Sequence, residues 1–360
     1  MSSVLPFDVI VLIIDINLLK ELALVSHSFR QISSKHLFAT IELHGADPVR
    51  HVASSKEGFI KLLKSRPAVV KYVRNLTYKV DYPSWEYYQH PHHDDPPFSS
   101  TNPSLDNDDP PLLLLQNLLR TIPHLNCLAI TADLNWNFLD SFLTSAFLHL
   151  THLPTINHID LSYIHDFPMS SLIPSVNLHW LDLSYVSDNC SPEIVVQSEM
   201  MPKIREFHTS GSSRLTKKLL CAKMQDGRPA FNFMDLRQLS ISLTHSEDLE
   251  DGEDLEDGED GEDLEDEQNI RYLVLQNAKI LENLHLSVVF GRSLVDLHGV
   301  LSPSACTLKV LDLSVLLEED GLAPPPLAGL WKELEAIAGH NLLEALSFEV
   351  HVEYHETEDL

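Results

Sequence analysis

The chain has 360 residues, of which 44% are hydrophobic, and a formal net charge of −28 at pH 7. This length allows two or three domains, and the apolar content suffices for a sizeable core. The acidic excess argues against nucleic acid or an anionic membrane as direct partners, because both attract Lys and Arg. No stretch reaches the roughly 20 apolar residues of a membrane span. No basic-then-apolar signal peptide is found either. We therefore expect a cytoplasmic or nuclear protein.

The charge is concentrated in one tract. Between Glu247 and Glu267 there are 15 acidic residues and no basic one, which leaves 38 acids against 25 bases, or −13, for the rest of the chain. Dense like charge interspersed with glycine opposes compact folding, so residues 245–268 are expected to form a disordered insertion. Residues 81–111, rich in Pro, Asp, Ser and His, are expected to form a second one.

Motifs of catalysis and metal binding are missing from the sequence. The four cysteines form no CxxC pair, so the usual spacing of zinc and redox sites is not found. The phosphate-binding glycine loops, HExxH and GxSxG do not occur. We therefore expect no enzymatic activity, no cofactor and no metal.

Residues 1–45 have the pattern of a compact helical unit. An apolar run from Val9 to Ile16 is followed by a second helical run from Leu18 to Val25, and Ser26 can cap a third helix. Ile41–Leu43 is expected to be a short strand. A unit this small is marginal as an independent domain, so its apolar surface predicts packing against something else.

The rest of the chain repeats the pattern apolar-x-x-apolar-x-apolar, as at Leu178, Leu181 and Leu183. The middle residues of the copies are Leu76, Leu128, Ile159, Leu181, Phe207, Leu239, Leu284, Leu311 and Leu346. When the two insertions are subtracted, the spacings lie between about 20 and 35 residues, as in leucine-rich repeats. Because strand side chains alternate between faces, the apolar residues are expected to fill a core and the intervening residues to face outward.

The sequence therefore predicts an α/β fold. A helical unit at 1–45 is followed by an irregular leucine-rich-repeat solenoid at 46–360 with one curved parallel sheet. Helical stretches such as 139–150 and 269–278 are expected on the convex side. Each repeat buries its apolar face only against its neighbours, so stability comes from the stack.

The N-terminal phrases resemble an F-box: Leu5-Pro6 at the start, Leu22-Ala23-Leu24-Val25-Ser26 in the second helix, and a closing phrase from His36 to Leu43 similar to that of fungal-type F-box proteins. An F-box followed by leucine-rich repeats implies a non-catalytic substrate receptor of an SCF-type ubiquitin ligase. By this resemblance the F-box docks a Skp-family adaptor, and through it a cullin, while the repeats hold a target. The adaptor-binding residues would be Leu5, Pro6, Ile10, Ile13, Ile14, Leu22, Val25, Ser26 and Phe29.

The outward positions of the repeats are the candidate target-binding surface, and a basic target segment would suit their charge. The candidate residues on this concave face are Asp160, Asp182, His208, Ser240, His285 and Asp312. Two alternatives remain open. One is a scaffold that no longer docks the adaptor, because the connector after Ile16 is shorter than in the family. The other is a binder of basic proteins that acts through the acidic tract.

Overall fold

The computed structural model describes part of the chain. The described residues are 33–44, 55–80, 119–138, 141–188, 195–196, 201–243, 273, 277, 279–290, 307–318 and 343–353. The nine predicted adaptor-binding residues and both predicted insertions lie outside them. No helix among the described residues is long and apolar enough to cross a membrane.

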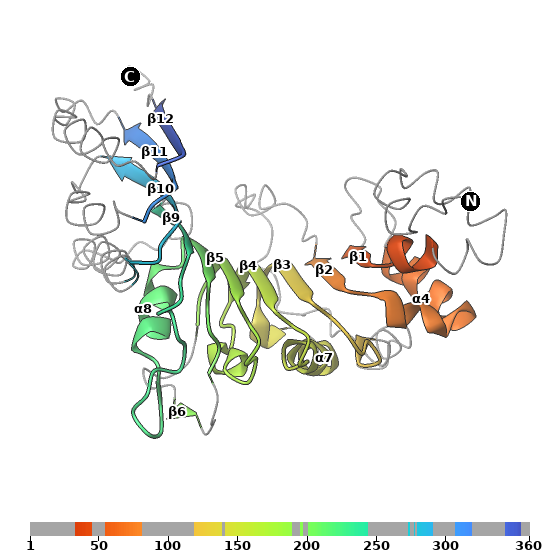
Figure 1. Cartoon of the computed structure of the whole chain (residues 1–360). Coiled ribbons are helices and arrows are strands. Elements are labelled where there is room, and N and C mark those ends of the chain that lie inside the picture. The colour runs from red at the N-terminus through yellow and green to blue at the C-terminus, as the bar shows by residue number, and fades with distance from the viewer. Residues whose placement is uncertain are drawn as a thin grey trace, which may run out of the picture. The chain divides into compact units, whose positions relative to one another are not determined.

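The fold is α/β with ten strands in one open sheet (Figure 1), and the strand order follows the sequence. The strands are β1 (Thr40–His44), β2 (Asn75–Val80), β3 (Cys127–Asn135), β4 (His158–His165), β5 (Trp180–Val186), β7 (Glu206–Ser210), β9 (Gln238–Leu243), β10 (Asn283–Phe290), β11 (Val310–Glu318) and β12 (Ala345–Glu353). The registered strand pairs are parallel, which confirms the predicted class and parallel sheet. β6 (Val195–Val196) and β8 (Lys223–Met224) pair separately.

The chain divides into two units, and the first comprises residues 1–132 and 139–156. It contains β1 and β2, most of β3, helix α4 (Ser55–Ser65), the 3-10 helix η1 (Pro67–Tyr72) and helix α7 (Ser141–Thr151). Leu76 lies opposite Leu128 as predicted, and both side chains are fully buried. Tyr78 meets the ring of Phe147 from α7 edge-on, with ring centroids 4.9 Å apart. The expected helix at 139–150 is thus present as α7 and packs against an inward side chain of β2.

The short strand expected at Ile41–Leu43 is present as β1 and pairs with β2, where Ile41 lies opposite Leu76. It is therefore the first strand of the sheet, one position ahead of the first predicted copy of the pattern. Leu43 is buried, as an inward residue two positions further along the strand should be.

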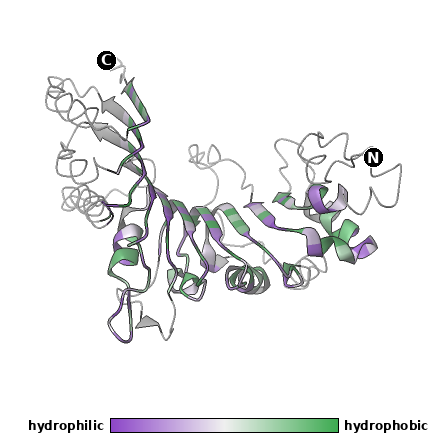
Figure 2. Ribbon diagram, in the orientation of Figure 1, coloured by the Kyte–Doolittle hydropathy of each residue, from purple (hydrophilic) through white to green (hydrophobic). Residues whose placement is uncertain are grey.

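The second unit comprises residues 133–138 and 157–360. It contains strands β4 to β12, helix α8 (Ser213–Cys221) and the 3-10 helices η2 (Trp136–Phe138) and η3 (Met169–Leu172). The middle residues of the predicted pattern lie side by side in this unit, in the order Ile159, Leu181, Phe207, Leu239, Leu284, Leu311 and Leu346. All are fully buried except Leu346 on the last strand, β12, which is 45% exposed. Figure 2 shows the alternation of hydrophobic and hydrophilic residues along β4 and β5.

Neighbouring strands of the second unit are joined by the same backbone arrangement where they begin. The carbonyl oxygen of Asn157 accepts hydrogen bonds from the N–H groups of His179 and Trp180, at 2.9 and 3.0 Å. The equivalent carbonyls that accept such a pair of bonds, at 2.7–3.1 Å, belong to His179, Arg205, Arg237, Glu282 and Lys309. This shared-carbonyl join fixes the register of each strand against the next one without using side chains.

Candidate interaction surface

One side of strands β4, β5, β7, β9, β10 and β11 carries polar side chains in rows, and we call it the polar face. Its middle row consists of the six residues predicted as the target-binding surface, which lie opposite one another on successive strands: Asp160, Asp182, His208, Ser240, His285 and Asp312. Because side chains alternate along a strand, each of these residues lies between two core positions yet is itself only half-buried.

Two further rows flank the middle row. Two residues earlier on the strands lie His158, Trp180, Glu206, Gln238 and Asn283. Two residues later, each strand carries a serine: Ser162, Ser184, Ser210, Ser242, Ser287 and Ser314. A surface three rows deep, with two rows six strands wide and one row five strands wide, is large enough to hold an extended segment of another protein.

An aromatic stack crosses the beginning of β4, β5 and β7. The imidazole of His158 lies parallel to the indole of Trp180, with ring centroids 4.3 Å apart and an interplanar angle of 10°. The imidazole of His208 lies on the other side of Trp180, with centroids 5.4 Å apart. The buried Trp180 Nε1 has no hydrogen-bond partner among the described residues. Trp180 is thus held flat on the polar face by rings on both sides.

Next to this stack, Asp160 and Asp182 form a carboxylate pair that is partly removed from water. Burial raises the pKa of Asp160. Burial, and secondly the charge of Asp160, raise the pKa of Asp182 to about 6. The hydroxyls of Ser162 and Ser184 donate to these carboxylates at 3.2 and 3.4 Å, which opposes the increase. At neutral pH the pair is ionised at a free-energy cost that a neighbouring cation would reduce.

Histidines supply no full positive charge to this pair at neutral pH. His208 Nδ1 lies 3.8 Å from Asp182 Oδ2, and the Gln238 amide lies 3.3 Å from His208 Nε2. Burial lowers the pKa of His208, and the charges of His285 and His158 lower it further. Burial likewise lowers the pKa of His158, against the attraction of Asp160. A neutral His208 with its proton on Nδ1 fits both contacts, since Nε2 can then accept from Gln238.

Further along the middle row, His285 Nδ1 lies 3.2 Å from Asp312 Oδ2. Both side chains are more exposed than those of His208 and Asp182, at 36% and 42% against 23% and 27%. This second contact is therefore more strongly screened by water, and the dehydrated part of the polar face lies on β4, β5 and β7.

The sequence analysis did not find a pair of tyrosines on the same strands. Tyr163 and Tyr185 follow the serine row, have positive φ angles of 57° and 53°, and stack with ring centroids 4.9 Å apart. Gly211, which directly follows β7, occupies the equivalent place with a φ of 56°, and the Tyr185 ring lies against it. The signal was present in the sequence as the phrase Asp-Leu-Ser-Tyr, which occurs at 160–163 and again at 182–185.

Comparison with known proteins assigns no family to this surface. No protein-family model matches the chain, and no curated protein matches it significantly. Among the described residues, no group of three or more His, Cys, Asp or Glu side chains could hold a metal ion. The polar face combines two carboxylates with a Trp–His stack and a tyrosine pair, groups that are chemically able to contact a cation or an aromatic ring.

Proposed function

We propose that the chain is a non-catalytic substrate receptor of an SCF-type ubiquitin ligase, with an F-box-like N-terminal segment and a leucine-rich-repeat solenoid. The N-terminal segment docks a Skp-family adaptor and through it a cullin, and the polar face binds the target protein. The observation that carries the repeat part of the proposal is the register of the second unit. Its apolar middle residues lie opposite one another on seven consecutive strands, with the same shared-carbonyl join between successive strands.

This regularity supports a solenoid because strands built to one template pack only on their neighbours along the stack. The spacing of the middle residues, about 20 to 35 residues outside the insertions, is that of leucine-rich repeats. In such arrays the exposed side of the parallel sheet is the usual place for a partner. The F-box part rests on the resemblance of residues 5–43, most of which lie outside the described residues.

The polar face favours a basic target segment. Asp160 and Asp182 lie side by side, and no Lys or Arg among the described residues forms an ion pair with either of them. A lysine or arginine placed between them would relieve the repulsion of the two carboxylates. It could also contact the face of the Trp180 ring, where cation–π attraction adds to the binding.

The adaptor part is tested by purifying the full chain together with a Skp-family adaptor. We expect a stable complex at micromolar concentration, and we expect Ile13→Asp together with Ile14→Asp to abolish it, because these changes put charge on the proposed docking helix. Asn17→Asp is the matched control and should leave the complex intact. If the wild-type chain forms no complex, the ligase proposal is wrong and the scaffold alternative takes its place.

The target part is tested with a fluorescent library of Lys- and Arg-rich peptides and an acidic library of equal length. We expect the basic library to bind and Asp160→Asn with Asp182→Asn to weaken binding about tenfold or more, because two charge-assisted contacts are lost. Asp226→Asn is the control, since Asp226 lies on a turn and is paired with Arg228 at 2.6 Å. Equal weakening by the control would mean that the net charge of the chain, and not the polar face, attracts the peptides.

A further inference from the structure

The outer edge of strand β12, which faces away from β11, carries apolar side chains of a kind that the rest of the sheet buries. Leu346 continues the row of Leu284 and Leu311, and Val350 lies four residues further along the strand on the same side. Leu346 and Val350 are 45% and 42% exposed, whereas Leu284 and Leu311 are fully buried. Among the described strands, β12 pairs only with β11. The apolar core of the second unit is therefore open to water at this edge.

The outer edge of β12 also presents backbone hydrogen-bonding groups. The Ala345 N–H donates to the Lys309 carbonyl at 3.1 Å, so the backbone polar groups of Ala345 point toward β11. Because these groups alternate along a strand, those of Leu346 and Val350 point away from β11. Edge strands are usually protected by proline, lysine or a covering segment. Residues 345–350 contain no proline and no basic residue, and five of the six are exposed.

The sequence from Leu346 to Val350 is complementary to itself when it is read in reverse. An antiparallel copy centred on Phe348 places Leu346 opposite Val350 of the second copy, and Ser347 opposite Glu349 of the second copy. The first pair joins the two exposed apolar side chains, and their outward backbone groups suit a hydrogen-bonded pair. The second pair joins a hydroxyl to a carboxylate. A copy centred on Glu349 would instead place two carboxylates opposite each other, which is unfavourable.

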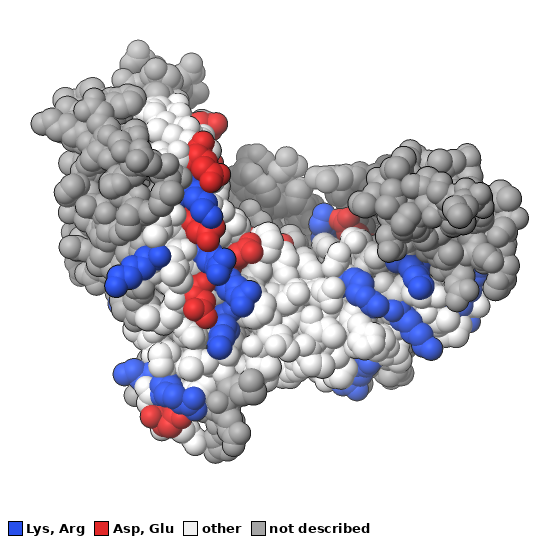
Figure 3. Space-filling view, viewed as in Figure 1, with Lys and Arg blue, Asp and Glu red and all other residues white. Residues whose placement is uncertain are grey.

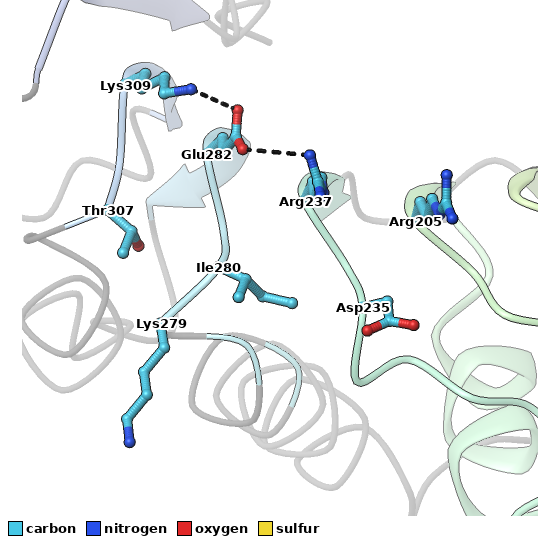
Figure 4. A pocket seen from close by; sticks show the side chains of 8 residues that line it. All are labelled: Arg205, Asp235, Arg237, Lys279, Ile280, Glu282, Thr307 and Lys309. Atoms are coloured by element: carbon cyan, nitrogen blue, oxygen red, sulfur yellow. Dashed lines mark hydrogen bonds and ion pairs between the residues drawn. The ribbon is translucent and has the colours of Figure 1, made fainter.

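The charged side chains where these strands begin are paired within the chain. Figure 4 shows Glu282 between Lys309 and Arg237, at distances of 2.7 and 3.6 Å. The hydrogen bond with Glu282 and, to a smaller extent, the charge of Glu344 raise the pKa of Lys309. Positive and negative side chains thus alternate from β9 to β12, and Figure 3 shows blue and red side chains interleaved along this edge. A partner of β12 would therefore be held by apolar and backbone contacts.

We propose that two copies of the chain pair through the outer edges of β12 and form a dimer with one continuous sheet. The two-fold axis passes through Phe348 perpendicular to the sheet, so the apolar sides of the two sheets join. Leu346 and Val350 of each copy then cover each other. The two polar faces lie on the same side, which lets the dimer hold a target with two basic segments more tightly than a monomer does. The dimer itself depends neither on the F-box resemblance nor on the proposed function.

The test measures the mass of the full chain by sedimentation equilibrium across the micromolar range. We expect it to rise from the 40.7 kDa of one chain to twice that value. Leu346→Lys should weaken the dimer about tenfold or more, because an inward-pointing charge replaces an apolar contact. Ser347→Lys is the matched control. It makes the same change of charge one residue away, yet it places the cation opposite Glu349 of the second copy, so it should dimerise at least as tightly as the wild type.

Val350→Pro tests the backbone contact without breaking the pairing of β12 with β11. Proline removes the N–H of a residue whose backbone groups point outward, so no bond to β11 is lost. We expect a monomer with the wild-type circular dichroism spectrum. A variant that keeps this spectrum and dimerises like the wild type would show that the edges do not pair.

Cysteine cross-linking tests the register. A mixture of Ser347→Cys chains and Glu349→Cys chains should form a disulfide on oxidation, because these positions face each other only between copies. Neither variant alone should cross-link more than the wild type. Equal cross-linking by a single variant and by the mixture would contradict the two-fold axis at Phe348.

Salt separates this contact from association through the acidic tract. Each copy carries a net charge of −28, so salt should strengthen the dimer by screening their repulsion. An acidic tract bound to a basic surface of the second copy would instead be released by salt and by deletion of residues 246–268. The proposal is overturned if the chain stays monomeric at low and at high salt, or if this deletion abolishes the dimer. It is also overturned if Leu346→Lys and Ser347→Lys weaken the dimer equally while both keep the wild-type circular dichroism spectrum.

Discussion

Replacing Asp182 by asparagine should stabilise the protein at neutral pH. The two side chains have the same shape, and the asparagine oxygen can still accept the hydrogen bond from the Ser184 hydroxyl at 3.4 Å. What the substitution removes is a negative charge that burial and the neighbouring Asp160 both disfavour. The pKa of Asp182 in the folded protein is about 6, above the 3.8 of an ordinary aspartate. The folded state therefore binds this proton more tightly, and the stability of the wild type falls as the pH rises from about 4 to about 6.

The size of the effect follows from this difference. At about 1.4 kcal/mol for each pKa unit, ionising Asp182 costs the folded state at most about 3 kcal/mol at pH 7.5. The side chain is 27% exposed, so water screens part of this cost and about 1–2 kcal/mol is expected. His208 does not offset it, because burial lowers the pKa of His208 and leaves the ring neutral at this pH.

Urea unfolding followed by circular dichroism, at pH 7.5 and at pH 4, measures this prediction. Asp182→Asn should gain about 1–2 kcal/mol at pH 7.5 and almost nothing at pH 4, where the wild-type carboxyl is already protonated. Asp312→Asn is the matched control: it changes the same Asp-Leu-Ser phrase at a side chain that is 42% exposed, and it should gain nothing. A loss of stability in Asp182→Asn at pH 7.5, or an equal gain at both pH values, would refute the account of the carboxylate pair.

Two further substitutions test the packing of the second unit. Gly211→Ala should lower the free energy of unfolding by about 1–3 kcal/mol, because its φ is 56° and the new Cβ would lie 2.5 Å from the Tyr185 ring. Gly227→Ala, with a φ of 83° but open space around it, should cost only the backbone part, and equal losses in the two variants would contradict the role of the ring. Asn277→Leu should cost about 2–3 kcal/mol in urea unfolding, because the Asn277 side chain accepts from the Leu236 N–H and donates to a backbone carbonyl while being 1% exposed. An unchanged midpoint would mean that these backbone groups find other partners.

The strands of the sheet could be predicted because their apolar residues alternate and recur. The copy of the pattern at Phe207, which has a polar residue at its last position, is a strand in register with its neighbours. Thr209 stands where the other copies have an apolar residue. In the structure Thr209 is buried, and its hydroxyl meets that of Thr216 on α8 at 3.2 Å. A polar inward residue is tolerated when a partner satisfies it, and this partner cannot be identified from the strand sequence alone.

The tyrosine pair could not be predicted by the same alternation. A period of two would place Tyr163 inside the core after the outward Ser162, yet Tyr163 is 47% exposed and Ile164 is buried. The residue with positive φ shifts the alternation by one, so two successive side chains face outward. Tyrosine is an unfavourable residue for this conformation, so the repeated phrase Asp-Leu-Ser-Tyr does not reveal the positive φ. Leu346 departs for a different reason, since among the described strands β12 pairs only with β11.

Of the candidate site, the middle row could be predicted and the rows beside it could not. The rule that outward residues lie in one line identified Asp160, Asp182 and His208 from the strand pattern alone. The stack of His158 on Trp180 depends on the register of the residues that begin each strand. That register is fixed by backbone bonds to the preceding strand, which leave no trace in the side chains. The predicted adaptor-binding residues lie outside the described residues and remain a prediction.

Because the shared-carbonyl join uses only backbone atoms, the pairing of the strands does not depend on which side chains stand at this edge of the sheet. Arginine, glutamate, lysine, histidine and asparagine all occupy the joining position, and each strand is held by the same two backbone bonds. The side chains at the joining positions can therefore be substituted without changing the backbone hydrogen bonds that hold the sheet together. The charged side chains at these positions could be replaced by oppositely charged ones, one strand at a time. The ligand preference of this edge would then change, while the free energy of unfolding would stay nearly constant.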